Sequence, residues 1–126
     1  MRILVVDRTG KYGPALKEAI RSLIPSLPDA QIAVTQQAPN LAAPSIRLIA
    51  LGPEECTDLP TTIQQLKQLG IHPPTMLYLL APYPDQWEQV EQSAEQVIGP
   101  GQFFVTRCTE ISPHQISAEF VAGALA

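Results

Sequence analysis

The sequence has few charged residues, and fewer of them are positive than negative. Lysine and arginine number 8 against 12 aspartates and glutamates, which gives a net charge of −4 at pH 7. A protein that binds the phosphate backbone of nucleic acids needs a basic surface, so this balance argues against nucleic-acid binding. No apolar run reaches the length of a transmembrane helix, and no signal-peptide pattern opens the chain. The sequence therefore predicts a cytoplasmic protein that does not enter the membrane.

Cysteine and histidine are also scarce, with two of each. Cys56 and Cys108 lie far apart and in no metal-ligand spacing, so we expect two free thiols and no metal site. Proline, in contrast, is abundant, and its 13 residues fall mostly between the apolar stretches, where they mark the ends of elements. There is no internal repeat or linker, so residues 1–126 are expected to form one domain with its own core.

Five short apolar stretches predict five strands. The third, residues 45–52, is a nearly unbroken apolar run that ends in Gly52 and is followed by proline, as expected for a strand buried on both faces of a parallel sheet. The other four stretches are residues 2–6, 31–35, 75–80 and 102–106.

Apolar residues at helical spacing lie between these strands and after the fifth, and they predict four helices, over residues 14–24, 59–69, 87–98 and 113–125. The first helix begins at a proline, and residues 85–88 and 112–115 resemble capping boxes at the starts of the last two. Residues 36–45 hold two prolines and one small apolar cluster, so the helix between the second and third strands is expected to be shortened or missing.

This alternation of strands and helices predicts an α/β fold. Right-handed crossovers then give a three-layer αβα sandwich around a five-stranded parallel sheet of order 2-1-3-4-5. In such a sheet the functional site lies at the edge formed by the carboxyl ends of the strands.

Three motifs in this order resemble the response-regulator receiver domain, and the resemblance covers the whole length of the chain. They are the opening RILVVD, the segment LPTTIQQLKQLGIHPPTMLYLLA, and FFVTR followed by SPHQISAEF. A receiver holds Mg²⁺ with an acidic pair after the first strand; Asp7 matches one member, but Arg8 stands at the other. The position of the phosphate-accepting aspartate is matched by Ala50.

The remaining working residues of a receiver are matched only in part. The Ser or Thr that ends the fourth strand is matched by Leu80, the Lys after the fifth strand by Arg107, and the switch aromatic by Phe104. Phosphoryl transfer needs a carboxylate nucleophile and a metal, so the resemblance implies a pseudo-receiver without phosphorylation chemistry. We expect Arg107, or failing it Arg8 or Lys11, to neutralise Asp7.

What the resemblance implies for function is a regulatory protein–protein interaction that does not depend on phosphorylation. Receivers dock partners, or a second copy of themselves, through the fourth helix, the fifth strand and the last helix. In this chain the fourth helix carries Glu88, Glu91 and Glu95 on its outer side. An ordinary solvated helix face would have the same composition. No cofactor is implied.

Two alternatives remain open. The loop of residues 7–13, with Thr9, Gly10 and Lys11, resembles the loop with which flavodoxins cradle the FMN phosphate, so FMN or another phosphorylated ligand could bind there. A small hydrolase is the other alternative, from the nearness of Ser112 to His114. No nucleophile and base can be paired on geometry, so we do not expect an enzyme, and we expect the neighbouring glutamates 54 and 55 to form a solvated loop face.

Overall fold

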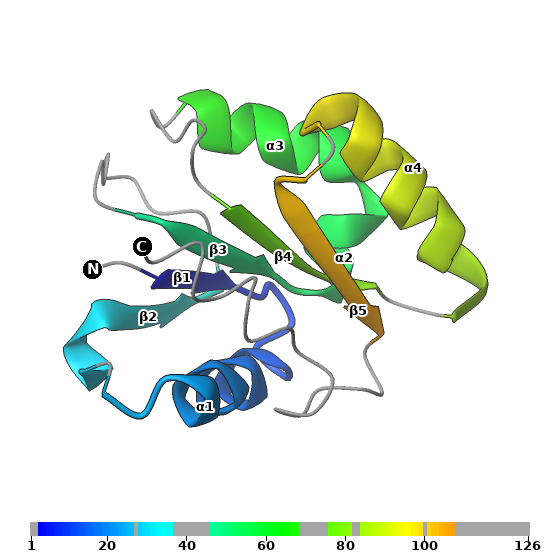
Figure 1. The fold of residues 1–126 in the computed structure, drawn as a ribbon. Coiled ribbons are helices and arrows are strands. Elements are labelled where there is room, and N and C mark those ends of the chain that lie inside the picture. Colours follow the sequence, from blue (N-terminus) through cyan, green and yellow to red (C-terminus); the bar gives the residue numbers. More distant parts are fainter. Residues whose placement is uncertain are drawn as a thin grey trace.

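The structure is a computed structural model, and it describes residues 3–26, 28–36, 46–68, 76–81, 84–99 and 101–107. Within these residues five strands form one sheet: β1 (Ile3–Val6), β2 (Ile32–Thr35), β3 (Leu48–Leu51), β4 (Met76–Ala81) and β5 (Phe103–Arg107). All neighbouring strands are parallel and their order is β2-β1-β3-β4-β5, which confirms the predicted α/β fold of flavodoxin-like topology (Figure 1).

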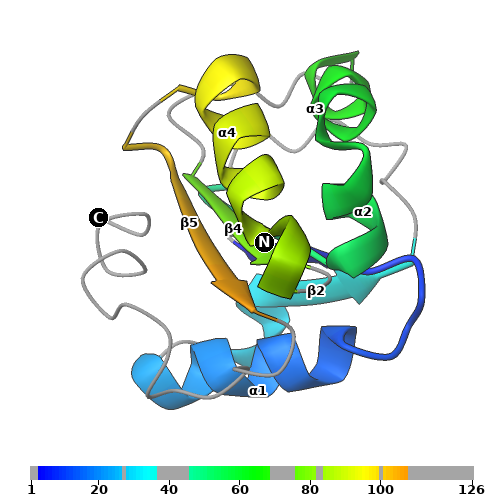
Figure 2. The same cartoon turned by 90° about the vertical axis from the view of Figure 1, so that its right-hand side faces the viewer.

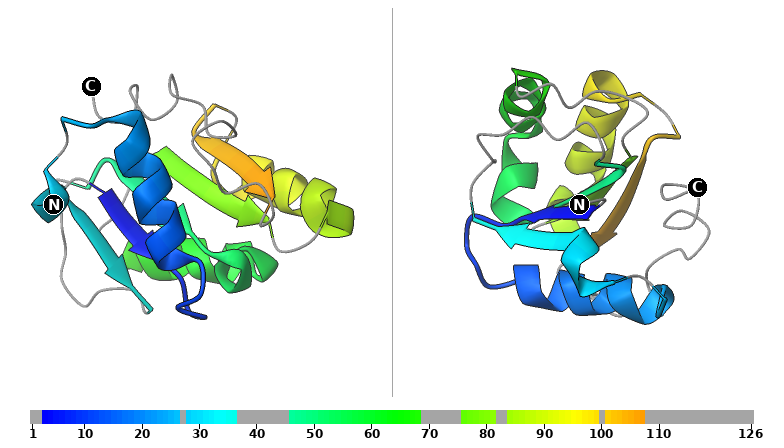
Figure 3. Two further views of the ribbon diagram at one scale, coloured as in Figure 1. Left: turned by 90° about the horizontal axis from the view of Figure 1, so that it is seen from below. Right: turned by 90° about the vertical axis from the view of Figure 1, so that its left-hand side faces the viewer.

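Four helices flank the sheet: α1 (Gly13–Leu23), α2 (Pro53–Thr57), α3 (Leu59–Gln68) and α4 (Trp87–Val97). Two short 3-10 turns, η1 (Asp29–Gln31) and η2 (Pro84–Gln86), precede β2 and α4. Helix α1 lies on one face of the sheet, while α2, α3 and α4 lie on the other, which gives the three layers of the predicted sandwich (Figure 2). Seen from the α1 side, this helix runs beside β1 and β2 (Figure 3).

Two apolar clusters hold these layers together, one on each face of the sheet. Because successive side chains of a strand point to opposite faces, Ile3 and Val5 pack toward α1, whereas Leu4 and Val6 pack toward α3 and α4. All four residues of β1 and all four of β3 are buried, as expected for central strands of a parallel sheet. The rigid sheet therefore fixes where the loops at its carboxyl edge begin.

Two local predictions were wrong. The stretch after β3 was expected to be a loop but forms helix α2, whose five residues are too few to show a helical repeat; Gly52 lies at its N-cap and Pro53 opens it. The capping box predicted at residues 85–88 does not form. Helix α4 begins at Trp87, and its N-cap residue Gln86 makes no side-chain capping hydrogen bond.

The helix predicted over residues 113–125 and the shortened helix between the second and third strands fall outside the described residues. None of the described helices is both long and apolar enough to cross a membrane.

Candidate functional site

Asp7 stands at the carboxyl end of β1, where the sheet opens into its first loop. Its amide N–H donates to the Thr35 carbonyl oxygen at 2.9 Å, so the β1–β2 ladder extends one residue beyond Val6. The side chain is completely buried. A buried carboxylate is stable only when its oxygens are hydrogen-bonded or paired, so its partners decide its role.

The loop that follows supplies those partners. Asp7 Oδ1 accepts hydrogen bonds from the Thr9 amide at 3.2 Å and the Thr9 hydroxyl at 2.8 Å. Oδ2 accepts from the amides of Tyr12 at 2.6 Å and Gly13 at 2.9 Å. Gly13 is the first residue of α1, whose N-cap residue Tyr12 makes no side-chain cap. Asp7 therefore acts as the anionic cap of α1, five and six residues ahead of the amides that it binds.

This arrangement bears on the predicted anion-binding loop of Thr9, Gly10 and Lys11. A phosphate held by such a loop needs free backbone amides that point toward it. Here the amides of Thr9, Tyr12 and Gly13 already donate to Asp7, and the Lys11 amide donates to the Thr9 hydroxyl at 3.1 Å. A second anion would have to displace the Asp7 carboxylate, so the geometry argues against a phosphate in this loop.

The receiver-like positions on the central strands lie inside the sheet rather than at its edge. Ala50 pairs with Val5 and Tyr78, and Leu80 pairs with Thr106; both side chains are completely buried. The residue beside Asp7 is instead Gly52, whose amide donates to the Val6 carbonyl oxygen at 2.8 Å. A Cβ at Gly52 would lie 2.5 Å from Asp7 Oδ1. Neither Ala50 nor Gly52 can accept a phosphoryl group.

The fifth strand carries the other two receiver-like positions. Phe104 stacks on Tyr78, with ring centroids 5.7 Å apart and planes 12° apart, and joins the cluster on the α1 face. Arg107 pairs through its backbone with Ala81 at the carboxyl end of β5. Its side chain lies outside the part of the chain that the structure describes, so the ion pair with Asp7 stays a prediction.

The two other cations proposed for Asp7 have other described contacts. Arg8 Nε is 4.0 Å from Glu54 Oε2, an exposed pair that contributes little. Lys11 Nζ lies 5.8 Å from the centre of the Tyr12 ring. Neither cation is placed as the partner of Asp7.

Sequence reasoning missed Glu55. We expected a solvated glutamate pair; Glu54 is indeed exposed, but Glu55 is only 5% exposed. Its Oε1 accepts a hydrogen bond of 2.7 Å from the Arg8 amide, across 47 residues of sequence. Its buried Oε2 has no hydrogen-bond partner among the described residues. Burial raises the pKa of this carboxyl, the nearby Asp7 adds to the rise, and hydrogen bonds from the backbone of Glu55 and Arg8 oppose it.

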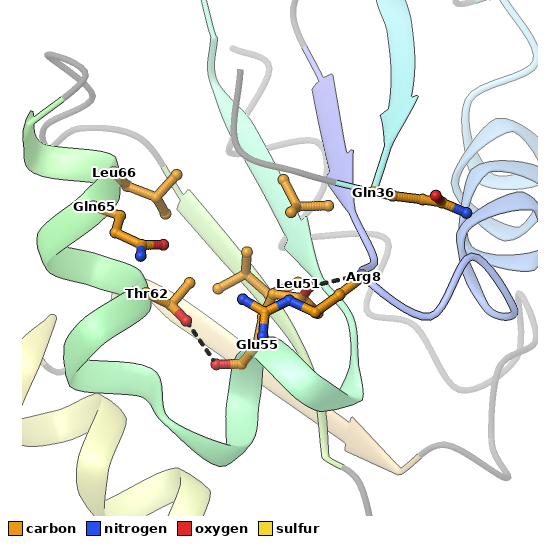
Figure 4. A pocket seen from close by; sticks show the side chains of 8 residues that line it. Arg8, Gln36, Leu51, Glu55, Thr62, Gln65 and Leu66 are labelled. Atoms are coloured by element: carbon orange, nitrogen blue, oxygen red, sulfur yellow. Dashed lines mark hydrogen bonds between the residues drawn. The ribbon is translucent and has the colours of Figure 1, made fainter. Parts of the chain in front are cut away.

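Glu55 lines a pocket of about 160 Å³ between the β1–α1 loop and helices α2 and α3 (Figure 4). The apolar lining comes from Val6, Leu51 and Leu66. Arg8 extends over Glu55 from the loop after β1, and Gln65 lies on α3 (Figure 4). The pocket thus combines an apolar lining with one buried acid and one exposed cation.

The described residues do not support the other candidate sites, namely a hydrolase pair or a metal site. Ser112, His114 and Cys108 lie outside the described residues, while Cys56 is buried and its thiol donates to the Leu51 carbonyl oxygen at 3.8 Å. Within the described ranges no three His, Cys, Asp or Glu side chains are grouped to hold a metal ion. Comparisons with protein-family models, curated proteins and solved structures found no match to this chain.

Proposed function

We propose that this chain is a pseudo-receiver, a regulatory module that binds a protein partner without being phosphorylated. The observation that carries the proposal is the saturation of Asp7. Its two carboxylate oxygens accept four hydrogen bonds from the loop of Thr9 to Gly13, and the side chain is fully buried. A receiver's acidic residue has to bind Mg²⁺, whereas this one holds its own loop in place.

The residues around Asp7 support the same proposal. Phosphoryl transfer to the chain requires a nucleophile within reach of the donor. Beside Asp7 stands Gly52, which has no side chain, and Ala50 lies two residues deeper in the sheet. A fold that keeps the receiver topology but has no nucleophile at Ala50 or Gly52 is suited to constitutive binding rather than to a phosphorylation switch.

The partner surface is proposed to include α4 and the neighbouring β5. Glu88, Glu91 and Glu95 are exposed on α4, while Val90 and Ala94 face the core. This spacing places the three carboxylates along the solvent side of one helix, which favours a partner with basic groups. The proposal includes a cytoplasmic location. Self-association through the same surface is the alternative to binding a different protein.

The test of partner binding is a comparison of three forms of the chain as bait in its native host. Wild type is compared with the triple variant Glu88→Lys, Glu91→Lys, Glu95→Lys and with a matched control, Glu18→Lys, Glu54→Lys, Asp58→Lys, which reverses three exposed acids elsewhere. We expect the α4 variant to lose the co-purifying partner and the control to retain it. Equal recovery with all three baits would contradict the proposed surface.

The test of the missing phosphorylation is the intact mass after incubation with acetyl phosphate and Mg²⁺. We expect no change in mass and no change in partner recovery. A stable gain of one phosphoryl group on an aspartate would show a working receiver. A flavin absorbance band that survives purification would favour the FMN-binding alternative instead.

A further inference from the structure

The pocket beside Glu55 lies at the point where the connections of the sheet change direction. From β1 the chain continues to β2 on one side, and it then returns to β3 on the other side. Ligands of open α/β sheets bind in the crevice outside the carboxyl ends of the two strands at this switch point. Val6 and Leu51, the last residues of β1 and β3, both line the pocket. Its location is therefore the one where this class of fold places ligands.

Glu55 places a buried carboxylate in the pocket, and one of its oxygens has no described hydrogen-bond partner. The residue is 5% exposed, and Oε2 has no described partner, although Oε1 accepts a hydrogen bond from the Arg8 amide. Leaving a buried carboxylate oxygen unpaired is costly, and each such group in a native structure calls for an explanation by a water, an ion or a ligand. A cationic or strongly donating group that enters the pocket would remove this cost.

Arg8 gives the same pocket a second, opposite charge. Its side chain is 67% exposed, and its described ion pair is the distant one of 4.0 Å with Glu54. An arginine in this situation can bind an incoming carboxylate. A ligand with only an ammonium group would be repelled by Arg8, and one with only a carboxylate would be repelled by Glu55. The two side chains together favour a zwitterion.

The size and lining of the pocket further limit which zwitterions could bind there. Its volume of about 160 Å³ is well below the roughly 300–1,000 Å³ of sites for drug-sized ligands, so a flavin or dinucleotide would not be enclosed. Val6, Leu51 and Leu66 supply an apolar surface for a short aliphatic side chain. We propose that this pocket binds a free aliphatic amino acid, with its ammonium group at Glu55, its carboxylate at Arg8 and its side chain against the apolar residues.

The experiment is calorimetric titration of the full chain with L-leucine and with two analogues that each lack one charge. Leucinamide keeps the ammonium group, and 4-methylpentanoate keeps the carboxylate. We expect saturable binding of L-leucine and affinities about tenfold weaker or worse for both analogues. Absence of binding at millimolar L-leucine would overturn the proposal and leave water as the partner of Glu55. Equal binding of leucinamide would also overturn it, because Arg8 would then have no role.

Two variants with matched controls test the assigned contacts. Arg8→Gln removes the guanidinium but leaves the backbone amide that holds Glu55, and Glu55→Gln removes the charge with little change of shape. Each should weaken L-leucine binding about tenfold, whereas Arg47→Gln at the opposite edge of the sheet and the exposed Glu54→Gln should not. Unchanged affinity in Arg8→Gln would refute the site even if Glu55→Gln failed to fold. The result does not depend on the proposed partner surface, because none of the described lining residues belongs to α4 or β5.

Discussion

Asp7 and Glu55 are both buried carboxylates at the carboxyl edge of the sheet, and both contact the loop between β1 and α1. Asp7 accepts four hydrogen bonds, two on each oxygen. Glu55 accepts one from Arg8 on Oε1, while Oε2 has no described partner. The difference separates two uses of a buried charge: a saturated carboxylate organises its own loop, whereas a half-satisfied one remains available to a ligand.

The largest expected effect comes from removing the saturated carboxylate. Asp7→Ala leaves the part-buried amide of Tyr12 and the buried amide of Gly13 without an acceptor and removes the anion at the start of α1. We expect a loss of about 3 kcal/mol in the free energy of unfolding, measured with urea. Glu91→Ala, an exposed acid on α4, should change it by less than about 0.5 kcal/mol. Equal losses in the two variants would mean that the hydrogen bonds around Asp7 do not stabilise the fold.

The next effect concerns the close approach of Gly52 to Asp7. The backbone of Gly52 is extended, with φ −73° and ψ 179°, so alanine is allowed by conformation. Its Cβ, however, would lie 2.5 Å from Asp7 Oδ1 and 2.9 Å from Cγ. We expect Gly52→Ala to cost about 2 kcal/mol by forcing the carboxylate away from its donors.

A double-mutant cycle assigns this cost to its cause. If the clash is with Asp7, Gly52→Ala should cost clearly less in the Asp7→Ala background than in wild type. The same penalty in both backgrounds would show that the methyl group disturbs something other than the carboxylate.

The two carboxylates also show what could be predicted from the sequence. The strands followed from local patterns, because apolar runs such as that of β3 are contiguous in the sequence, and the rule of right-handed crossovers then gave the strand order and the layers. Asp7 was singled out because it matches the acidic position after the first strand of a receiver, although its donors, two to six residues later, were not foreseen. Glu55 was missed because its donor is 47 residues away and because α2 is too short for a periodic signal. Gly52 was missed because only the strand register places it beside Asp7.

A smaller effect is expected from Thr9, whose side chain donates to Asp7. The Thr9 hydroxyl donates to Oδ1 at 2.8 Å and accepts from the Lys11 amide at 3.1 Å. Because Thr9 is exposed, water can replace part of what is lost, and we expect Thr9→Ala to cost about 1 kcal/mol in urea unfolding. Thr9→Ser keeps the hydroxyl and should retain most of the stability. A serine variant as unstable as the alanine variant would assign the effect to the lost methyl group.

The smallest effect is a pH dependence that comes from Glu55. Burial raises the pKa of Glu55 in the folded chain, and Asp7 adds to the rise, while the backbone hydrogen bonds and the charge of Arg8 lower it. In the unfolded chain a glutamate titrates near its usual value of about 4.3. Below that pH the glutamate is protonated in both the folded and the unfolded chain, and its contribution to stability is fully present. As the pH rises, the unfolded state ionises first, so stability falls until the pH has passed the raised pKa of the folded state.

Glu55→Gln has no ionisable group at this position, so its stability should not decrease in this way as the pH rises. We therefore expect the free energy of unfolding of wild type, relative to Glu55→Gln, to decrease as the pH is raised above about 4.3 and then to level off. The two proteins differ only at this residue, so contributions that are common to both cancel in the difference. Glu54→Gln, at an exposed neighbour, should run parallel to wild type. Urea unfolding of the three proteins across this pH range measures the effect. If the difference in free energy of unfolding between wild type and Glu55→Gln does not change with pH, the Glu55 carboxyl is ionised as easily in the folded chain as in water. In that case the contrast between the two carboxylates would be one of hydrogen-bond geometry alone.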